Sequence, residues 1–227
     1  MNPPAEAEAV FGDQLGLAER FAQWLIGPGL TRGLLGPREA DQIWERHLLN
    51  GVSIADLIEP TSVVLDIGSG AGLPGLALLL ARPDLQLVLI EPKVRRVDFL
   101  REVCADLGLP ARIVRARATP DGLVLLPDDV TGGAVPPADV VTARAVAPIG
   151  DLALWAKPLL RREGRLLAIK GDAAPAELHR DRTVLTALGF LDAAVLTAGT
   201  SVASGPMSPV MTATVISMRL GGVSRET

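Results

Sequence analysis

Apolar residues near the start of the chain recur at the spacing of amphipathic helices. Residues 13–26 carry one such set, and residues 38–58 carry a second. A Gly-Pro-Gly turn at residues 27–29 separates them, and Gly51 is expected to interrupt the second helix. The pattern therefore predicts an N-terminal helical extension over residues 1–60.

From residue 61 onward, short apolar runs alternate with helical segments. Repeated strand–helix units predict an α/β fold, in which a mostly parallel sheet carries helices on both faces. The last two strands follow each other without a helix, so one of them is expected to be antiparallel at the edge of the sheet. The predicted strands cover residues 63–67, 85–90, 111–116, 139–143, 165–169, 193–197 and 211–218. One predicted helix begins at Leu73 and others cover 95–107, 149–160 and 176–188, with a poorly patterned helix and loop over 120–137 and a turn at 163–164.

The length and composition of the chain limit the classes of protein to consider. A chain of 227 residues suits one domain with an extension, so residues 61–227 are expected to form a single compact unit. No apolar run approaches the roughly 18 residues of a membrane span, and the first residues do not resemble a signal peptide. These features predict a cytoplasmic protein. Cys104 is the only cysteine and lies among apolar residues, and His47 and His179 are far apart, which predicts a buried structural thiol and no metal site.

The distribution of charge is less decisive. The net charge of −4 argues against a broadly basic surface for nucleic acid. Basic residues nevertheless outnumber acidic ones between Arg82 and Lys170, which allows a basic face on that part of the molecule. A surface of mixed charge without a partner explains the same distribution.

Residues 63–75, VVLDIGSGAGLPG, join an apolar strand to an acid and closely spaced glycines. The glycines allow a tight turn whose free amides point at a ligand. The spacing Asp66-x-Gly68-x-Gly70-x-Gly72 favours the first motif of S-adenosylmethionine-dependent methyltransferases over the dinucleotide fingerprint G-x-G-x-x-G. In that motif the acid lies near the amino-acid end of the cofactor. The alternative is a plain turn in which Asp66 caps the following helix.

A second acid fits the same interpretation. Glu91 ends the apolar run 85–90, about 20 residues after the glycines, where a carboxylate can accept both ribose hydroxyls of a nucleoside. The alternative is a solvated acid at the end of a strand.

Five segments carry a more specific pattern, WERHLLN at 44–50, DIGSGAGLPG at 66–75, KVRRVDFLREV at 93–103, TARAVAPI at 142–149 and GRLLAIKG at 164–171. In this order they resemble the glucose-inhibited division protein B family, bacterial enzymes that methylate N7 of a guanine in small-subunit ribosomal RNA. The resemblance implies a class I methyltransferase with a Rossmann-like, seven-stranded, mostly parallel sheet and S-adenosylmethionine as cofactor. The implied partner is 16S ribosomal RNA or the small ribosomal subunit, and a monomer suffices.

The resemblance also implies roles for single residues. Arg144 is expected at the active site as the catalytic residue, where it contacts the cofactor and positions guanine or phosphate. Guanine N7 carries a lone pair at neutral pH, so the reaction needs alignment of the nucleophile rather than a general base. Relatives usually carry an acid where this chain has Thr119, so a backbone amide would make that contact here. With Asp66 and Glu91, the implied cofactor contacts are Gly68, Gly70, Leu73, Ala118, Thr119 and Arg144.

Basic residues beside these motifs are candidates for contacts with RNA, and their alternative is a solvated strand end or helix face. Trp44 and Trp155 follow helical apolar patterns and are expected in the core. His47 contacts RNA or, as the favoured interpretation, packs between the extension and the main domain. The candidate RNA contacts are Arg46, Arg95, Arg96, Arg117 and Lys170.

Two other functions share part of this pattern. A methyltransferase that acts on a small metabolite or a protein would keep the glycine loop and Glu91 but would not need the flanking segments. A non-catalytic nucleotide-binding module would not need the complete set of cofactor residues.

Overall fold

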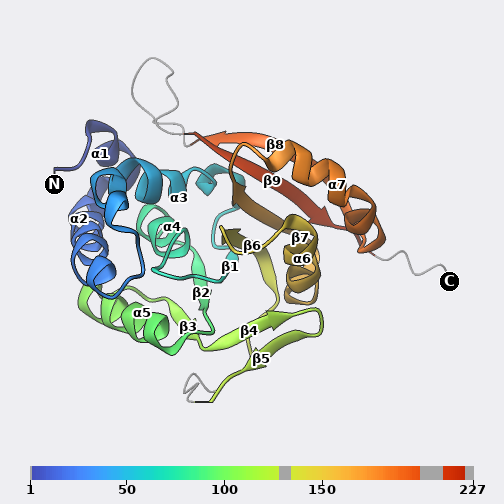
Figure 1. Ribbon diagram of the computed structural model, residues 1–227, viewed down its shortest axis with the longest axis horizontal. Helices are drawn as coiled ribbons and strands as arrows, with labels where there is room; N and C mark the ends of the chain where they lie inside the picture. The colour runs from blue at the N-terminus through green and yellow to red at the C-terminus, as the bar shows by residue number, and fades with distance from the viewer. Residues whose placement is uncertain (1, 128–133, 200–211, 223–227) are drawn as a thin grey trace.

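A seven-stranded sheet lies at the centre of the structure, a computed structural model that describes residues 2–127, 134–199 and 212–222 (Figure 1). Its strands are β1 (Val63–Ile67), β2 (Gln86–Ile90), β3 (Arg112–Val114), β6 (Ala138–Arg144), β7 (Leu160–Lys170), β8 (Phe190–Gly199) and β9 (Thr212–Leu220). They are arranged in the order β3-β2-β1-β6-β7-β9-β8. All neighbours are parallel except those of β9, which is antiparallel to both β7 and β8. The predicted α/β class and mostly parallel sheet are therefore confirmed.

The place of the antiparallel strand differs from the prediction. β9 lies between β7 and β8, so β8 forms the edge of the sheet. Burial gives the physical reason, because Val215 and Ile216 of β9 are fully buried whereas most residues of β8 are partly or fully exposed. A strand that is apolar on both faces belongs between two neighbours.

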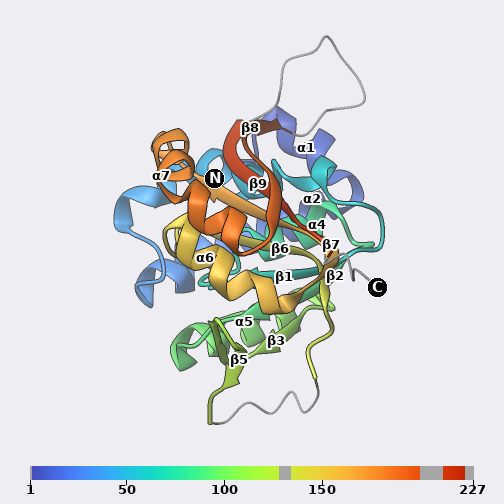
Figure 2. The same cartoon turned by 90° about the vertical axis from the view of Figure 1, so that its right-hand side faces the viewer.

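Helices cover both faces of the sheet, as predicted (Figure 1 and Figure 2). Successive residues of a strand face opposite layers, so Val64 belongs to one hydrophobic core and Leu65 to the other. The first core lies under the N-terminal extension and the helices that follow β1 and β2, and the second lies under the helices that follow β6 and β7. The helices of the first face are α1 (Ala5–Phe11), α2 (Leu15–Trp24), α3 (Asn50–Val52), α4 (Gly75–Ala81) and α5 (Val94–Leu107), and those of the second are α6 (Ile149–Ala156) and α7 (Ala174–Ala187).

The helix predicted over 13–26 is confirmed by α2, whereas short irregular turns replace the long helix predicted over 38–58. Pro28 lies inside a π-helical turn, Leu25–Gly29, that continues α2. The segment predicted as one helix over 38–58 consists of the turns Pro37–Gln42, Ile43–Leu49 and Ala55–Leu57 together with α3. α1 is missing from the predicted elements because only two of its residues are buried, which leaves no clear apolar period.

Gly51 lies within α3 and does not interrupt it, in contrast to the prediction. A Cβ at this position would lie 3.2 Å from the Cβ of Ala77 and 3.4 Å from the Cα of Pro74. Gly51 therefore allows the extension to approach α4 closely. The extension is packed tightly elsewhere too, since Trp44 is 1% exposed and meets the ring of Phe11 edge to face.

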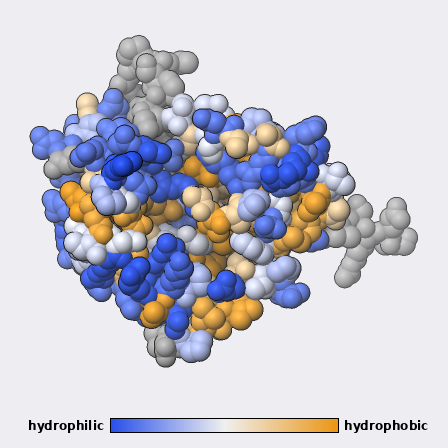
Figure 3. Space-filling model, viewed as in Figure 1, coloured by the Kyte–Doolittle hydropathy of each residue, from blue (hydrophilic) through white to orange (hydrophobic). Residues whose placement is uncertain are grey.

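A β-hairpin occupies part of the segment for which a helix and loop were predicted. β4 (Ala116–Thr119) pairs with β5 (Gly122–Leu125) through a turn in which Gly122 has a φ of 118°. Residues 128–133 of that segment lie outside the described residues. Val124 and Leu125 are 51% and 58% exposed, and Figure 3 shows apolar surface over this hairpin beside the hydrophilic surface of α5. The sequence pattern is weak because the hairpin buries Ala116 and Ala118 but exposes Val124 and Leu125, so its apolar residues follow no single period.

The predicted turn at 163–164 is an irregularity inside a longer strand. β7 begins at Leu160, and its register with β6 shifts between Ala138 and Val140. Glu163 adopts a φ of 63° at this point. Ala138 pairs with Leu160 and Val140 with Arg165, so β7 has three extra residues here. Extra residues locally disrupt pairing without ending the strand, so the sequence signal resembles a turn.

Two expectations from composition concern single side chains. Cys104 is buried, and burial raises its pKa to about 11, which confirms a structural thiol. Trp44 lies in the core, as expected.

No helix among the described residues is long and apolar enough to cross a membrane.

We predict that Gly51→Leu destabilises the protein by about 1–3 kcal/mol, because the new side chain overpacks the contact with α4. The matched control is Gly16→Leu, since Gly16 is exposed in α2 with no atom near its absent Cβ, and leucine is a better helix former there. Urea unfolding of both variants measures the difference. Equal stability of the two variants would contradict the close approach.

Candidate active site

A cavity of about 570 Å³ opens at the carboxyl ends of β1, β2 and β6. Ligands of doubly wound folds bind at this edge of the sheet. Leu34 and Leu35 of the extension and Trp155 of α6 contribute to its walls, and no sequence motif predicts any of the three at the site. Trp155 was expected in the core, but it is only partly buried there and also faces the cavity. The predicted cofactor residues that line the cavity are Gly68, Gly70, Leu73, Glu91, Ala118, Thr119 and Arg144.

The glycine loop is held close to two other segments. The amides of Gly68 and Ser69 both donate to the carbonyl of Ile90, at 2.8 and 3.2 Å. Gly68 has a φ of 71°, and a Cβ there would lie 2.8 Å from a methyl group of Val146. Both the backbone conformation and the contact therefore require glycine at position 68.

Asp66 does not lie on the wall of this cavity, and its contact with the cofactor stays a prediction. Its side chain is fully buried, and Oδ2 accepts the amide of Gly75, the first residue of α4, at 3.3 Å. Burial raises the pKa of Asp66 to about 7, opposed mainly by that hydrogen bond. The contact agrees with the alternative interpretation, in which the acid serves the start of the helix.

Glu91 lines the cavity and holds the loop in place. Its carboxylate is 1% exposed, so it is not a solvated acid. Oε2 accepts the amide of Gly70 at 3.0 Å and Oε1 accepts the amide of Lys93 at 2.9 Å, while Arg96 Nη1 lies 3.5 Å from Oε2. One carboxylate therefore ties the glycine loop to the segment that follows β2.

Arg144 ends β6 and is anchored by the N-terminal extension. Its guanidinium donates to the carbonyl of Arg46 at 3.0 Å and lies 3.0 Å from Nδ1 of His47. Burial lowers the pKa of Arg144, partly offset by the charges of Asp66 and Glu39. The extension thus fixes the orientation of a charged side chain on the wall of the cavity.

His47 is buried between the extension and the sheet, as the favoured interpretation predicted. Because arginine is only a donor, His47 Nδ1 must accept, which places the proton of the neutral ring on Nε2. Nε2 lies 3.6 Å from Oε1 of Glu39. Burial, followed by the charge of Arg144, lowers the pKa of His47 to about 4.

Thr119 directs its side chain toward the hairpin. Its hydroxyl donates to the carbonyl of Gly122 at 3.0 Å, within the turn that joins β4 to β5. Thr119 and Ala118 nevertheless line the cavity through this hairpin. The side chain of Thr119 is therefore engaged within the hairpin, and its backbone is the group that can contact a ligand.

The candidate RNA contacts fall into three groups. Arg96 and Arg117 line the cavity, whereas Arg46 and Arg95 are exposed outside it. Lys170 is 12% exposed and pairs with Glu177 at 2.7 Å, so it is neither a solvated strand end nor a free cation for phosphate. The sequence does not reveal this pairing, because it depends on how α7 packs and places Glu177 beside the end of β7.

We predict that lowering the pH from 7 toward 4 removes about 3 kcal/mol of stability through His47, because its pKa is about 4 in the folded chain and 6.5 when unfolded. The contribution is complete above pH 6.5 and is lost as the unfolded state takes up the proton. His47→Gln keeps an acceptor for Arg144 but does not titrate. Urea unfolding of both proteins across this range isolates His47, since the opposite contribution of Asp66 is common to both. Parallel pH profiles would show that His47 is not buried in its neutral form.

Comparisons with known proteins agree with this site. The family model described as rRNA small subunit methyltransferase G matches residues 14–203. The ribosomal RNA small subunit methyltransferase G of Mycobacterium marinum is 49% identical over 205 residues, which cover 90% of this chain and 86% of the relative. That of Mycobacterium leprae is 47% identical over 203 residues, covering 89% and 80%.

Solved structures share the fold at lower identity. An S-adenosylmethionine-dependent O-methyltransferase from Thermotoga maritima has a TM-score of 0.56 at 14% identity, covering 78% of this chain and 66% of that one. TrmN from Thermus thermophilus has a TM-score of 0.52 at 23% identity, covering 89% and 52%. The fold is therefore that of class I methyltransferases, and by its sequence the chain belongs to the rRNA small subunit methyltransferase G family.

Proposed function

We propose that this chain transfers a methyl group from S-adenosylmethionine to N7 of a guanine in 16S ribosomal RNA. The observation that carries the proposal is a single cavity bordered by the glycine loop, Glu91 and Arg144, in a chain of this family. A methyltransferase of a metabolite or a protein is not favoured, because the similar relatives are named as ribosomal RNA methyltransferases. The site lies within one chain, which suits a monomer, and ribosomal RNA as substrate suits a cytoplasmic location.

The residues of the cavity fit S-adenosylmethionine. Glu91 presents a carboxylate at the end of β2, where ribose hydroxyls can donate to it. Gly68 and Gly70 place backbone rather than side chains against the ligand. Ala118 and the backbone of Thr119 form a small, mainly apolar wall that suits a base. When bound, S-adenosylmethionine supplies a methyl group on a sulfonium, which is open to attack by a lone pair.

Arg144 is proposed to position the acceptor. A guanidinium has five N–H donors, and its contacts with Arg46 and His47 hold it while leaving others for guanine or phosphate. Guanine N7 needs no base to remove a proton, so the chain contributes orientation and the exclusion of water. Arg96 and Arg117 at the cavity, with Arg46 and Arg95 outside it, are proposed to contact the RNA backbone.

We predict that Glu91→Ala weakens binding of S-adenosylmethionine by about 1–3 kcal/mol, the cost of removing a charged hydrogen-bond partner. The same change should lower thermal stability, because the amides of Gly70 and Lys93 lose their acceptor. Glu91→Gln keeps one acceptor oxygen and should lose less of both. Isothermal titration calorimetry with the folded variants measures the affinities, and unchanged affinity in Glu91→Ala would refute the placement of the cofactor.

We predict that the purified chain methylates small subunits that lack this modification, and not metabolite or protein extracts, when radiolabelled S-adenosylmethionine is supplied. Arg144→Lys should slow single-turnover transfer on the order of 100-fold and lower thermal stability far less, because a lysine cannot reproduce the planar fork that aligns the acceptor. Arg219→Lys, whose position pairs with Asp192 at the far end of β9, is the control. Label in the extracts alone would contradict the proposed substrate, and near-normal turnover of Arg144→Lys would contradict its role.

A further inference from the structure

A second cavity of about 580 Å³ adjoins the first at the ends of β6 and β7. Its walls include the segment Ala145–Pro148 and the start of α7. Ala145 and Val146 line both cavities, so a planar ligand in the second cavity can reach the first across Val146. Ala145, at this junction, has a φ of 54°, and strained residues of this kind cluster at functional sites.

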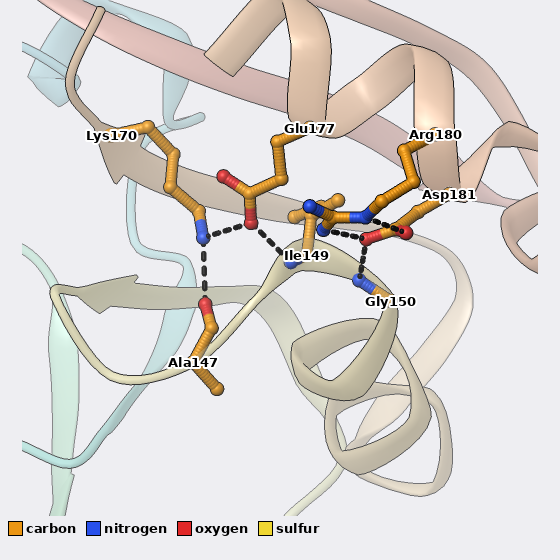
Figure 4. Close-up of polar contacts among 7 residues, drawn as sticks. All are labelled: Ala147, Ile149, Gly150, Lys170, Glu177, Arg180 and Asp181. Carbon is orange, nitrogen blue, oxygen red and sulfur yellow. Dashed lines mark hydrogen bonds and ion pairs between the residues drawn. The ribbon is translucent and has the colours of Figure 1, made fainter. Parts of the chain in front are cut away.

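Glu177 is the acidic side chain of the second cavity, and its two oxygens differ (Figure 4). Oε1 accepts from Lys170 Nζ at 2.7 Å and from the amide of Ile149 at 2.5 Å. Lys170 also donates to the carbonyl of Ala147 at 2.7 Å. The contacts described for Glu177 all end on Oε1, and Figure 4 shows both dashed lines meeting on that oxygen while Oε2 carries none. Oε2 is therefore oriented by its neighbours but still able to accept.

A carboxylate at this place distinguishes guanine from adenine. The Watson–Crick edge of guanine presents N1–H and the N2 amino group, both donors, whereas adenine presents an acceptor at N1. Enzymes that modify a base often read its Watson–Crick edge in a pocket. N7 lies on the opposite edge of the purine, so a guanine whose Watson–Crick edge faces Glu177 turns N7 away from it, toward Val146 and the first cavity.

We infer that the second cavity receives the acceptor guanine and that Oε2 of Glu177 accepts from its N1–H and N2 amino groups. The inference rests on the proposed function and names the residue that selects guanine. The pair formed by Lys170 and Glu177 then has a positioning role, since it fixes the carboxylate and the segment that borders both cavities. Val146 and Pro148 supply apolar surface for the face of the base.

Glu177→Gln tests the inference with little change in structure. The two donors that meet Oε1 hold the amide oxygen of the glutamine in that place, which turns its NH₂ group toward the guanine donors. We expect kcat/KM on unmethylated small subunits to fall by about 10- to 100-fold, the range for loss of a charged hydrogen bond. Thermal stability should fall, because Lys170 loses its charged partner, while the affinity for S-adenosylmethionine should stay at the wild-type value.

Asp192→Asn is the control, because Asp192 pairs with Arg219 at 2.9 Å at the edge of the sheet and lines neither cavity. It should retain wild-type kcat/KM. A second readout uses subunits reconstituted with inosine, which lacks the N2 amino group, at the acceptor position. The loss caused by Glu177→Gln should be smaller on inosine than on guanosine.

Equal losses on the two substrates, or an equal loss in Asp192→Asn, would overturn the inference and leave Glu177 a purely structural acid. Failure of the proposed function is distinguishable, because the wild-type chain would then transfer no methyl group to either RNA.

Discussion

The buried carboxylate of Glu91 is the contact on which the cavity depends. It accepts two backbone amides, from Gly70 and Lys93, and so joins the glycine loop to the segment after β2, beside the bonds that the amides of Gly68 and Ser69 donate to Ile90. Leaving either amide buried without an acceptor costs about 1–3 kcal/mol, which is large beside the stability of a whole domain. The same acid faces the cavity, so the group that shapes the loop is also available to a ligand.

The N-terminal extension is part of this site rather than an appendage. Arg144 leaves the sheet at the end of β6 but is held by Arg46 and His47, which lie almost one hundred residues earlier in the chain. Leu34 and Leu35 add to the wall of the cavity. The apolar residues of the extension also share one core with α4 and α5, so loosening the extension would alter both the stability of the chain and the direction of Arg144.

The sequence predicts the central part of this fold well for a physical reason. Parallel strands buried on both faces form continuous apolar runs, and the turn after β1 requires residues without a Cβ, so both leave direct signals. The extension and the β4–β5 hairpin leave weaker signals. Their helical turns are short and of mixed type, and the hairpin exposes Val124 and Leu125, so neither follows one period.

The predicted site residues also differ in how clearly the sequence indicates their positions. Glu91 and Gly68 are recognisable because strand ends and glycine loops fix where they lie. The sequence does not indicate the contacts of Asp66 and Lys170. The partner of such a side chain depends on which face of the strand it occupies and on which residues the following helix places beside it. Asp66 faces α4, and Lys170 meets an acid from α7. A basic residue in a motif therefore indicates a bound anion only if no acid of its own chain reaches it first. Among the residues that the structure describes, no acid pairs with Arg117 on the wall of the cavity, so Arg117 meets that condition more closely than the paired Lys170.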